Sequence, residues 1–261
     1  MAIPRIVHQT AAAANPPAWC EPFRNRILHL HPGWDHRYYD QAGCREVLGR
    51  EFPALLPLYD EYPFDIQRVD LFRVVVVYVS GGFYMDLDID CHEPLDQLCE
   101  SRCVLGEEKT LSPEETCRLG HRDSLRVANY MFGSESRHPF WLEVLNEMRC
   151  RADRTIVSEN DILESTGPGL WTTVYHRVKD HYPDLLLLRN DRLTCGECAT
   201  ISCQFGAFAS HLHAGSWRWE GLSRPGTSQA GTGCGGSQTD YQHIRQLLAL
   251  NRRGRVLPHA T

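Results

Sequence analysis

The first part of the chain alternates between apolar, β-branched segments and segments with helical spacing. Residues Ile3–Gln9 are apolar and β-branched and run into a loop of alanine, asparagine and proline, which predicts a buried strand. Residues Trp19–Leu30 carry apolar side chains at helical spacing, and Asp35–Tyr39 predicts a second strand. This order of strand, helix and strand is typical of an α/β domain.

The segment Phe64–Val79 contains four consecutive valines and is followed by a Ser-Gly-Gly sequence. Valine favours a strand, but the length of the run and the glycines behind it are typical of a helix with a C-terminal glycine cap. We therefore expect a helix, preceded by a weakly helical or irregular stretch at Glu46–Leu58. On this helix Asp70 and Arg73 share one face, where they either project together toward a ligand or form a local ion pair.

Behind the glycines, apolar and acidic residues alternate from Met85 to Asp90. If this segment is one strand, Asp86, Asp88 and Asp90 project from the same face, with neighbouring carboxylates about 7 Å apart. Such carboxylates repel each other unless a cation or hydrogen-bond donors compensate them, and their oxygens suit Mn²⁺ or Mg²⁺. The alternative is a solvated acidic sheet edge. The strongly apolar flanking sequence favours the metal site.

The later chain predicts further elements and one more polar cluster. We expect an amphipathic helix at His138–Arg149, a turn at Thr166–Gly169 and a short strand at Leu185–Leu188. Residues His211–Trp217 then bring two imidazoles, a hydroxyl and an indole close together in the sequence. These groups are candidates for a binding site, and a buried histidine pair with an ordinary core tryptophan is the alternative.

Length and composition favour one main domain. The chain has 261 residues, of which 42% are hydrophobic and 23% charged, as in ordinary globular proteins. From Ser223 onward the sequence becomes rich in glycine, serine and threonine. We therefore expect a folded domain over residues 1–222, a flexible linker over 223–240, and a C-terminal helix and tail over 241–261.

Charge, hydropathy and cysteine usage restrict the partners and the compartment. The formal net charge is -6, so the chain as a whole does not attract nucleic acid. The longest apolar stretch, Val74–Val79, is far shorter than the roughly 18 to 20 residues of a transmembrane helix. The N-terminus lacks the layout of a secretory signal, and the eleven cysteines occur without any N-glycosylation sequon. We therefore expect a cytoplasmic protein without a transmembrane segment.

Two other chemistries fit parts of the sequence. An aspartate pair such as Asp86 and Asp88 also serves haloacid-dehalogenase-type phosphohydrolases, although the pair then stands nearer the N-terminus than it does here. Cys195, Cys198 and Cys203, with the two later histidines, have the chemistry of a zinc clip in a non-enzymatic binding module. A single Cys-x-x-Cys pair is a weak signal, and reduced surface thiols are the simpler interpretation.

The order of five segments resembles one family of sugar transferases. The segments are IPRIVHQT, HPGW, RVDLFRVVVVYVSGGFYMDLDIDCHEPLD, TGPGLWT and HLHAGSW, between about residues 3 and 220. They resemble glycosyltransferase family 32, which includes the initiating α-1,6-mannosyltransferase and the inositolphosphoceramide mannosyltransferases, and more distantly the clostridial toxin glucosyltransferase domains. The resemblance implies an α/β GT-A fold, with a Rossmann-like mixed sheet flanked by helices, a nucleotide-sugar donor and a divalent metal, Mn²⁺ or Mg²⁺.

The resemblance also assigns roles to individual residues. Asp70 and Arg73 resemble the pair that holds the hydroxyls of the donor sugar, and Asp88 resembles the metal ligand. The residues implied in donor binding are His8, Gln9, Asp70, Arg73, Tyr84, Asp86, Asn129, Ser216 and Trp217. The residues implied in catalysis are Arg73, Asp86 and Asp88, and those implied in metal binding are Asp88, His211 and His213.

The stereochemistry of the reaction is implied by the resemblance, whereas the donor nucleotide and the acceptor stay open. The family retains the anomeric configuration, so we expect a retaining hexosyltransferase. Family members commonly carry a base-stacking tryptophan where this chain has Ala11, so a UDP donor and a GDP donor are both open, and Trp19 is the candidate substitute. The acceptor is equally open among glycan, lipid, protein and small molecule, because acceptor pockets are built from variable loops.

Overall fold

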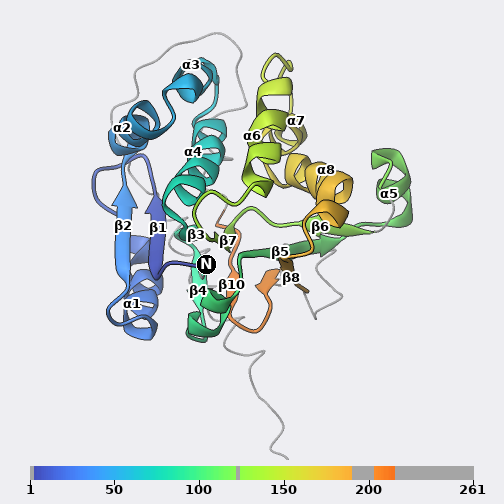
Figure 1. Cartoon of the computed structure of the whole chain (residues 1–261). Helices are drawn as coiled ribbons and strands as arrows, with labels where there is room; N and C mark the ends of the chain where they lie inside the picture. The colour runs from blue at the N-terminus through green and yellow to red at the C-terminus, as the bar shows by residue number, and fades with distance from the viewer. Residues whose placement is uncertain (1–2, 122–123, 190–202, 215–261) are drawn as a thin grey trace, which may run out of the picture.

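The computed structural model describes residues 3–121, 124–189 and 203–214 (Figure 1). The expected linker over 223–240 and the C-terminal helix over 241–261 lie outside the described residues. The strands are β1 (Ile6–Thr10), β2 (Asp35–Tyr39), β3 (Gly82–Met85), β4 (Ile89–Cys91), β5 (Cys103–Thr110), β6 (Leu125–Val127), β7 (Met131–Ser134), β8 (Leu185–Leu188), β9 (Cys203–Phe205) and β10 (Ala209–His211).

The main sheet is mixed and has the strand order β2-β1-β3-β7-β5-β6, with β8 also paired to β5. The first three strands of this order are parallel, and β7 is antiparallel to β3. The carboxyl ends of β1, β2 and β3 therefore meet at one edge, beside the beginning of β7. In open α/β sheets ligands bind outside the carboxyl ends of the parallel strands, at the point where the order reverses.

Helices cover both faces of this sheet (Figure 1). Most of them lie on one face, above the sheet in the view, whereas α1 lies on the other face together with the small antiparallel sheet β4-β10-β9. The helices are α1 (Glu21–Leu30), α2 (Gln41–Glu51), α3 (Leu56–Glu61), α4 (Asp65–Ser80), α5 (Pro113–Leu119), α6 (Phe140–Cys150), α7 (Glu159–Ser165) and α8 (Pro168–Val178).

Helix α4 confirms the helical interpretation of the valine run. Every residue from Asp70 to Val77 is buried, so the helix is enclosed on all sides, and β-branched residues are tolerated because packing outweighs their weak helix propensity. Gly81 and Gly82 then turn the chain into β3 with φ values of 68° and 95°. A Cβ on Gly82 would lie 2.6 Å from the carbonyl oxygen of Ile6, so the turn requires glycine.

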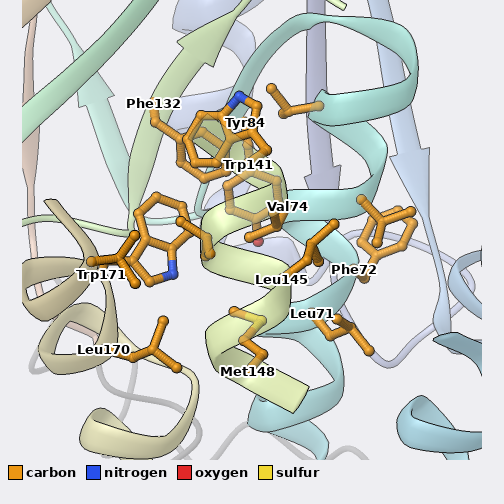
Figure 2. Close-up of a cluster of buried hydrophobic side chains, with 14 of the residues drawn as sticks. Leu71, Phe72, Val74, Tyr84, Phe132, Trp141, Leu145, Met148, Leu170 and Trp171 are labelled. Carbon is orange, nitrogen blue, oxygen red and sulfur yellow. The ribbon is translucent and has the colours of Figure 1, made fainter. Parts of the chain in front are cut away.

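The larger apolar core lies between the sheet and the helices α4, α6 and α8 (Figure 2). Phe132 of β7 packs against Trp141 of α6 and Trp171 of α8, with ring centroids 4.9 Å and 4.7 Å apart. Tyr84 of β3 stacks on Phe132 at 5.6 Å. This packing fixes β3 and α4 against each other, and both elements carry candidate site residues.

Several other predicted elements are confirmed with small shifts. The strand Asp35–Tyr39 and the strand Leu185–Leu188 have the predicted bounds, and the helix expected at His138–Arg149 begins two residues later. The irregular stretch Glu46–Leu58 is more helical than expected, because α2, a 3-10 helix and α3 follow each other across its prolines. No helix among the described residues is long and apolar enough to cross a membrane. The cytoplasmic location stays a prediction.

The expected continuous strand from Met85 to Asp90 is wrong. Strand β3 ends at Met85, the chain turns through Leu87 and Asp88, and β4 begins at Ile89 and joins the second sheet. The turn separates the carboxylates that strict alternation would place in one row.

Candidate functional site

The candidate site lies at the edge where the parallel strands end. Asp86 follows β3 directly, and its backbone N–H donates to the carbonyl oxygen of Tyr130, just ahead of β7. Asp70 and Arg73 reach the same place from α4, where they contact Asp86 and Asn129. The site therefore forms at the reversal point of the sheet, where an α/β fold leaves room for a ligand.

Arg73 is the centre of a buried cluster, which we call the arginine cluster and which comprises Asp70, Arg73, Tyr84, Asn129 and Thr166. Its Nη1 donates to the carbonyl oxygen of Asn129 at 2.7 Å, and its Nη2 lies 3.4 Å from Asp70 Oδ1 and 3.4 Å from Asp86 Oδ1. The guanidinium lies 4.7 Å from the ring centroid of Tyr84. Its Nε is buried without a hydrogen-bond partner among the described residues, which leaves a donor for a ligand.

Asp70 is held in this cluster from three sides. Asn129 Nδ2 donates to its Oδ1 at 3.0 Å, and Thr166 Oγ1 donates to its Oδ2 at 2.8 Å. Burial raises the pKa of Asp70 to about 6, and Arg73 and the two hydrogen bonds oppose this rise. The pair Asp70 and Arg73 is thus an ion pair, as one of the two interpretations of the sequence had it, and it is built into a larger polar site.

Sequence reasoning did not assign a role to Thr166. The available signal was the Thr-Gly-Pro-Gly turn, in which the hydroxyl precedes the first turn of α8. Only the fold shows that this turn reaches α4. Thr166 fixes the orientation of the Asp70 carboxylate.

Asp86 links the arginine cluster to the second half of the site. Tyr84 Oη donates to Asp86 Oδ1 at 3.0 Å. Desolvation raises the pKa of Asp86; Arg73 opposes the rise, and the neighbouring charge of Asp88 adds to it. An added cation at this place would relieve the repulsion between the two carboxylates.

The second half of the site, the hairpin site, comprises Asp88, His211 and the backbone N–H of Ala214. His211 Nε2 lies 3.2 Å from Asp88 Oδ2, and the N–H of Ala214 donates to the same oxygen at 2.7 Å. Burial alone would raise the pKa of Asp88, but His211 and the Ala214 N–H lower it to about 2. His213 adopts a left-handed conformation with φ of 53° immediately before Ala214, and such strain is typical of functional sites.

Asp86, Asp88 and His211 can hold one metal ion. Each offers a ligand atom, and these atoms all lie within 4.8 Å of one another. Two carboxylates with one imidazole are suitable ligands for Mn²⁺, and the carboxylates also suit Mg²⁺. His213 instead places its Nε2 3.0 Å from Cys203 Sγ, so the structure brings His211 rather than His213 to the carboxylates.

Asp90 does not join this group, which corrects the expectation of three carboxylates on one face. Arg26 of α1 donates to Asp90 Oδ1 at 2.7 Å. The charge of Asp90 is therefore compensated by an arginine from the other face of the sheet. His211 takes its place as the third potential ligand beside Asp86 and Asp88. The turn after β3 causes this change, because Asp90 lies in β4 of the second sheet.

The two residues of β1 named from the sequence lie on opposite faces of the main sheet. His8 is buried, with Nε2 2.8 Å from the carbonyl oxygen of Gly81 and Nδ1 3.2 Å from Tyr39 Oη. Both ring nitrogens thus have partners within the protein, and its assignment to donor binding stays a prediction. Gln9 is also buried, and its Nε2 has no hydrogen-bond partner among the described residues. That amide could donate to a ligand.

Trp19 is the residue named from the sequence as a substitute for the base-stacking tryptophan, and that role stays a prediction. It is half-buried and packs with Ala11 and Tyr38 against an apolar cluster that contains Leu87 and Leu212. Four residues named from the sequence, Ser216, Trp217, Cys195 and Cys198, lie outside the described residues.

Comparison with known proteins identifies relatives of one kind. Residues 20–105 match the family described as "Glycosyltransferase sugar-binding region containing DXD motif". Inositol phosphoceramide mannosyltransferase 2 of Schizosaccharomyces pombe is 28% identical over 182 residues, which cover 70% of this chain and 49% of that protein. Mannosyl phosphorylinositol ceramide synthase SUR1 of Saccharomyces cerevisiae is 29% identical over 177 residues, which cover 68% of this chain and 43% of that protein. The chain thus matches about half the length of these relatives.

A solved structure supports the fold assignment. The ligand-free glycosyltransferase domain from the YGT toxin aligns with a TM-score of 0.50 at 10% identity, over 71% of this chain and 80% of that domain. The fold is the GT-A fold that the resemblance implied. These matches give no support to the phosphohydrolase or the zinc-clip hypothesis.

Proposed function

We propose that this chain, of which residues 20–105 match the DXD-containing glycosyltransferase family, is a metal-dependent, retaining hexosyltransferase with a nucleotide-sugar donor. The observation that carries the proposal is the contact between the two halves of the site. Arg73 lies 3.4 Å from Asp86, which shares a potential ion site with Asp88 and His211. A sugar-binding arginine and a diphosphate-binding ion site are thereby joined through one carboxylate.

The arginine cluster is suited to holding the hexose. Asp70 accepts hydrogen bonds, Arg73 Nε offers an unpaired donor, and sugar hydroxyls use both kinds of group. Thr166 and Asn129 keep Asp70 in place, so little reorganisation is needed when the donor binds. In this proposal Arg73 and Asp70 orient the sugar, and Asp86 lies between the sugar and the diphosphate.

The hairpin site is suited to the diphosphate. Asp86, Asp88 and His211 would hold Mn²⁺, or Mg²⁺, and the bound ion would supply positive charge to the diphosphate leaving group. Asp88 is buried and Asp86 and His211 are half-buried, so the interactions of the ion with these residues would be stronger than in bulk water. Retention follows the family. It agrees with a site in which Asp70, Asp86 and Asp88 already have donor-binding roles.

The names of the relatives suggest which substrates to test first. The two relatives named above are called an inositol phosphoceramide mannosyltransferase and a mannosyl phosphorylinositol ceramide synthase. We propose mannose as the first sugar to test and an inositol-bearing lipid as the first acceptor, with glycan and protein acceptors next. Trp19 beside Ala11 is the proposed stacking partner of the base.

A panel of nucleotide sugars tests the proposal directly. GDP-mannose, UDP-glucose and UDP-galactose are incubated with the protein in Mn²⁺, in Mg²⁺ and in excess chelator, and release of the nucleoside diphosphate is measured. We expect turnover of one donor that needs the ion, and proton NMR should show the α anomer as the first product. Turnover that persists in excess chelator overturns metal dependence, and a β anomer formed before mutarotation overturns retention.

A further inference from the structure

The outer face of the small sheet carries a connected row of polar side chains. Arg26 Nη1 donates to Asp90 Oδ1 at 2.7 Å, and Asp90 Oδ2 lies 3.9 Å from His92 Nδ1. His92 Nε2 lies 2.6 Å from Ser210 Oγ, and Gln204 Nε2 donates to the same oxygen at 3.1 Å. This row, which we call the outer relay, joins α1, β4, β10 and β9.

The central three residues of the relay, Asp90, His92 and Ser210, are an aspartate, a histidine and a serine, as in the catalytic triad of a serine hydrolase, but they do not serve as one. Ser210 is 1% exposed and lies in the middle of a strand that is paired on both sides. A nucleophilic serine must reach a substrate carbonyl, and this hydroxyl has no route to one. The row therefore has another use.

The outer relay lies directly behind the hairpin site. Ser210 pairs with Asp90, and the next pair in the register is His211 with Ile89, which follows Asp88. Because side chains alternate along a strand, Asp90 and Ser210 point away from the face that carries His211. The two rows of side chains thus share the same two strands.

The two faces of β10 contribute different kinds of interaction. The inner face packs by apolar contact, since Ala209 and Phe205 belong to a core cluster with Met85 and Ile89. Apolar burial is non-directional and tolerates small shifts, whereas hydrogen bonds and ion pairs fix distance and angle. Backbone pairing sets the register of β10 on β4, and the relay adds directional side-chain contacts on one face of that pair.

We propose that Ser210 and His92, anchored by Asp90 and Arg26, are positioning residues that hold His211 and the Ala214 N–H against Asp88. The proposal rests on the proposed function, because it assigns the relay to the ion-binding half of that site. Groups that hydrogen-bond to metal ligands typically change metal affinity by about 10- to 100-fold when they are removed, and the relay acts on the ligands through the paired backbones of β4 and β10. We expect an effect of that size here.

A pair of buried strand serines allows a matched experiment. Ser210→Ala removes the centre of the relay. Ser134→Ala removes a serine that is 0% exposed and also donates to backbone carbonyls. It is the last residue of β7, at the end of that strand away from the site. Binding of Mn²⁺ alone to each full-length variant is measured by electron paramagnetic resonance, together with the melting temperature and amide hydrogen exchange of residues 203–211 in the metal-free protein.

We expect both serine variants to melt at a lower temperature, but only Ser210→Ala to weaken Mn²⁺ binding, by about 10- to 100-fold, and to speed hairpin exchange. His92→Gln, which keeps a polar group near Ser210, should retain affinity within about threefold of the wild type. If Ser210→Ala does not fold, Arg26→Gln at the exposed end of the relay should lower the affinity in the same direction.

Two results would overturn the inference, and they differ. If Ser210→Ala binds Mn²⁺ as well as Ser134→Ala does, the relay has no positioning role and the proposed function stands. If Ser210→Ala does not fold, wild-type Mn²⁺ affinity in Arg26→Gln leads to the same conclusion. If the wild type itself binds no Mn²⁺, the metal-dependent function falls and the positioning role falls with it.

Discussion

The two halves of the site are held in different ways. The arginine cluster is built on α4 and on the edge of the main sheet, where the aromatic core of Figure 2 fixes Tyr84 against the helices. The hairpin site is built on β4 and β10, which pair over three residues in a small separate sheet. If the arginine cluster holds the sugar and the hairpin site holds the ion, as proposed, the two halves should respond differently to mutation. Changes in the core should alter stability and activity together, and changes at the hairpin site should alter ion binding first.

The largest effect is expected at the hairpin site. Asp88→Asn replaces a charged ligand oxygen by a neutral amide beside His211, so we expect Mn²⁺ binding to be lost and turnover to fall by on the order of 10²- to 10³-fold. Titration with Mn²⁺ and steady-state kinetics measure both. Asp60→Asn, at an exposed aspartate paired with Arg45, is the control and should behave like the wild type. A fully active Asp88→Asn would contradict the metal-dependent proposal.

His8, which is buried in β1 of the main sheet, should make the stability of the protein depend on pH. Burial lowers the pKa of His8 to about 4, whereas in the unfolded chain it is near 6.5. Between these values the unfolded state binds the proton and the folded state does not, so the free energy of unfolding falls as the pH is lowered from 6.5 to 4. The loss from this group is about 3 kcal/mol.

Urea unfolding of the wild type and of His8→Gln between pH 4 and pH 7 measures this contribution. The variant should show a shallower loss of stability toward low pH, although it is less stable at pH 7. His29→Gln, at an exposed histidine of α1, is the control and should follow the wild-type curve. Parallel curves for the wild type and His8→Gln would show that His8 does not titrate as its burial requires.

Arg73→Lys tests whether the arginine cluster needs a planar fork. Arg73 donates to the Asn129 carbonyl while it faces Asp70 and Asp86, and an ammonium cannot make these contacts at once. We expect kcat/KM to fall by about 10- to 100-fold, as when a charged hydrogen bond is lost. Arg68→Lys on the same helix, where Arg68 pairs with Asp65 nearer the surface, should change it little. Wild-type turnover in Arg73→Lys would reduce Arg73 to a structural ion-pair partner.

The smallest effect concerns the pH dependence of donor binding. The pKa of Asp70 is about 6, so its carboxylate is mostly charged at pH 7 and mostly protonated at pH 5. A protonated Asp70 loses its ion pair with Arg73 and is a weaker acceptor for sugar hydroxyls, so donor affinity should fall by up to about tenfold over this range. Calorimetric titration with the donor at each pH gives the affinity. Asp70→Asn should bind the donor weakly at both pH values. If donor affinity in this variant still falls between pH 7 and pH 5 as it does in the wild type, another group is responsible for the pH dependence.

The sequence predicted well those features that depend on local pattern. The strand Asp35–Tyr39 and the helix α4 follow from side-chain periodicity and from the glycine pair behind the helix, whose positive φ values few other residues tolerate. The two carboxylates Asp86 and Asp88 follow from the motif itself. Helical spacing placed Asp70 and Arg73 on one face, and the family resemblance gave them a role in donor binding. In the structure Arg73 contacts both Asp70 and Asp86.

What only the tertiary structure decided is which distant groups complete the site. Alternation along one strand placed Asp90 beside Asp86 and Asp88, but the chain leaves the main sheet after Met85, and Asp90 turns to Arg26 instead. Local pattern cannot show such a turn, because both strands have the same alternation. His211 and Thr166 lie more than 75 residues from the carboxylates that they contact, and only packing brings them there. The sequence by itself thus determined the acidic and basic groups of the site, and the fold determined their partners, since hydrogen bonds and ion pairs depend on distance in space and not on distance along the chain.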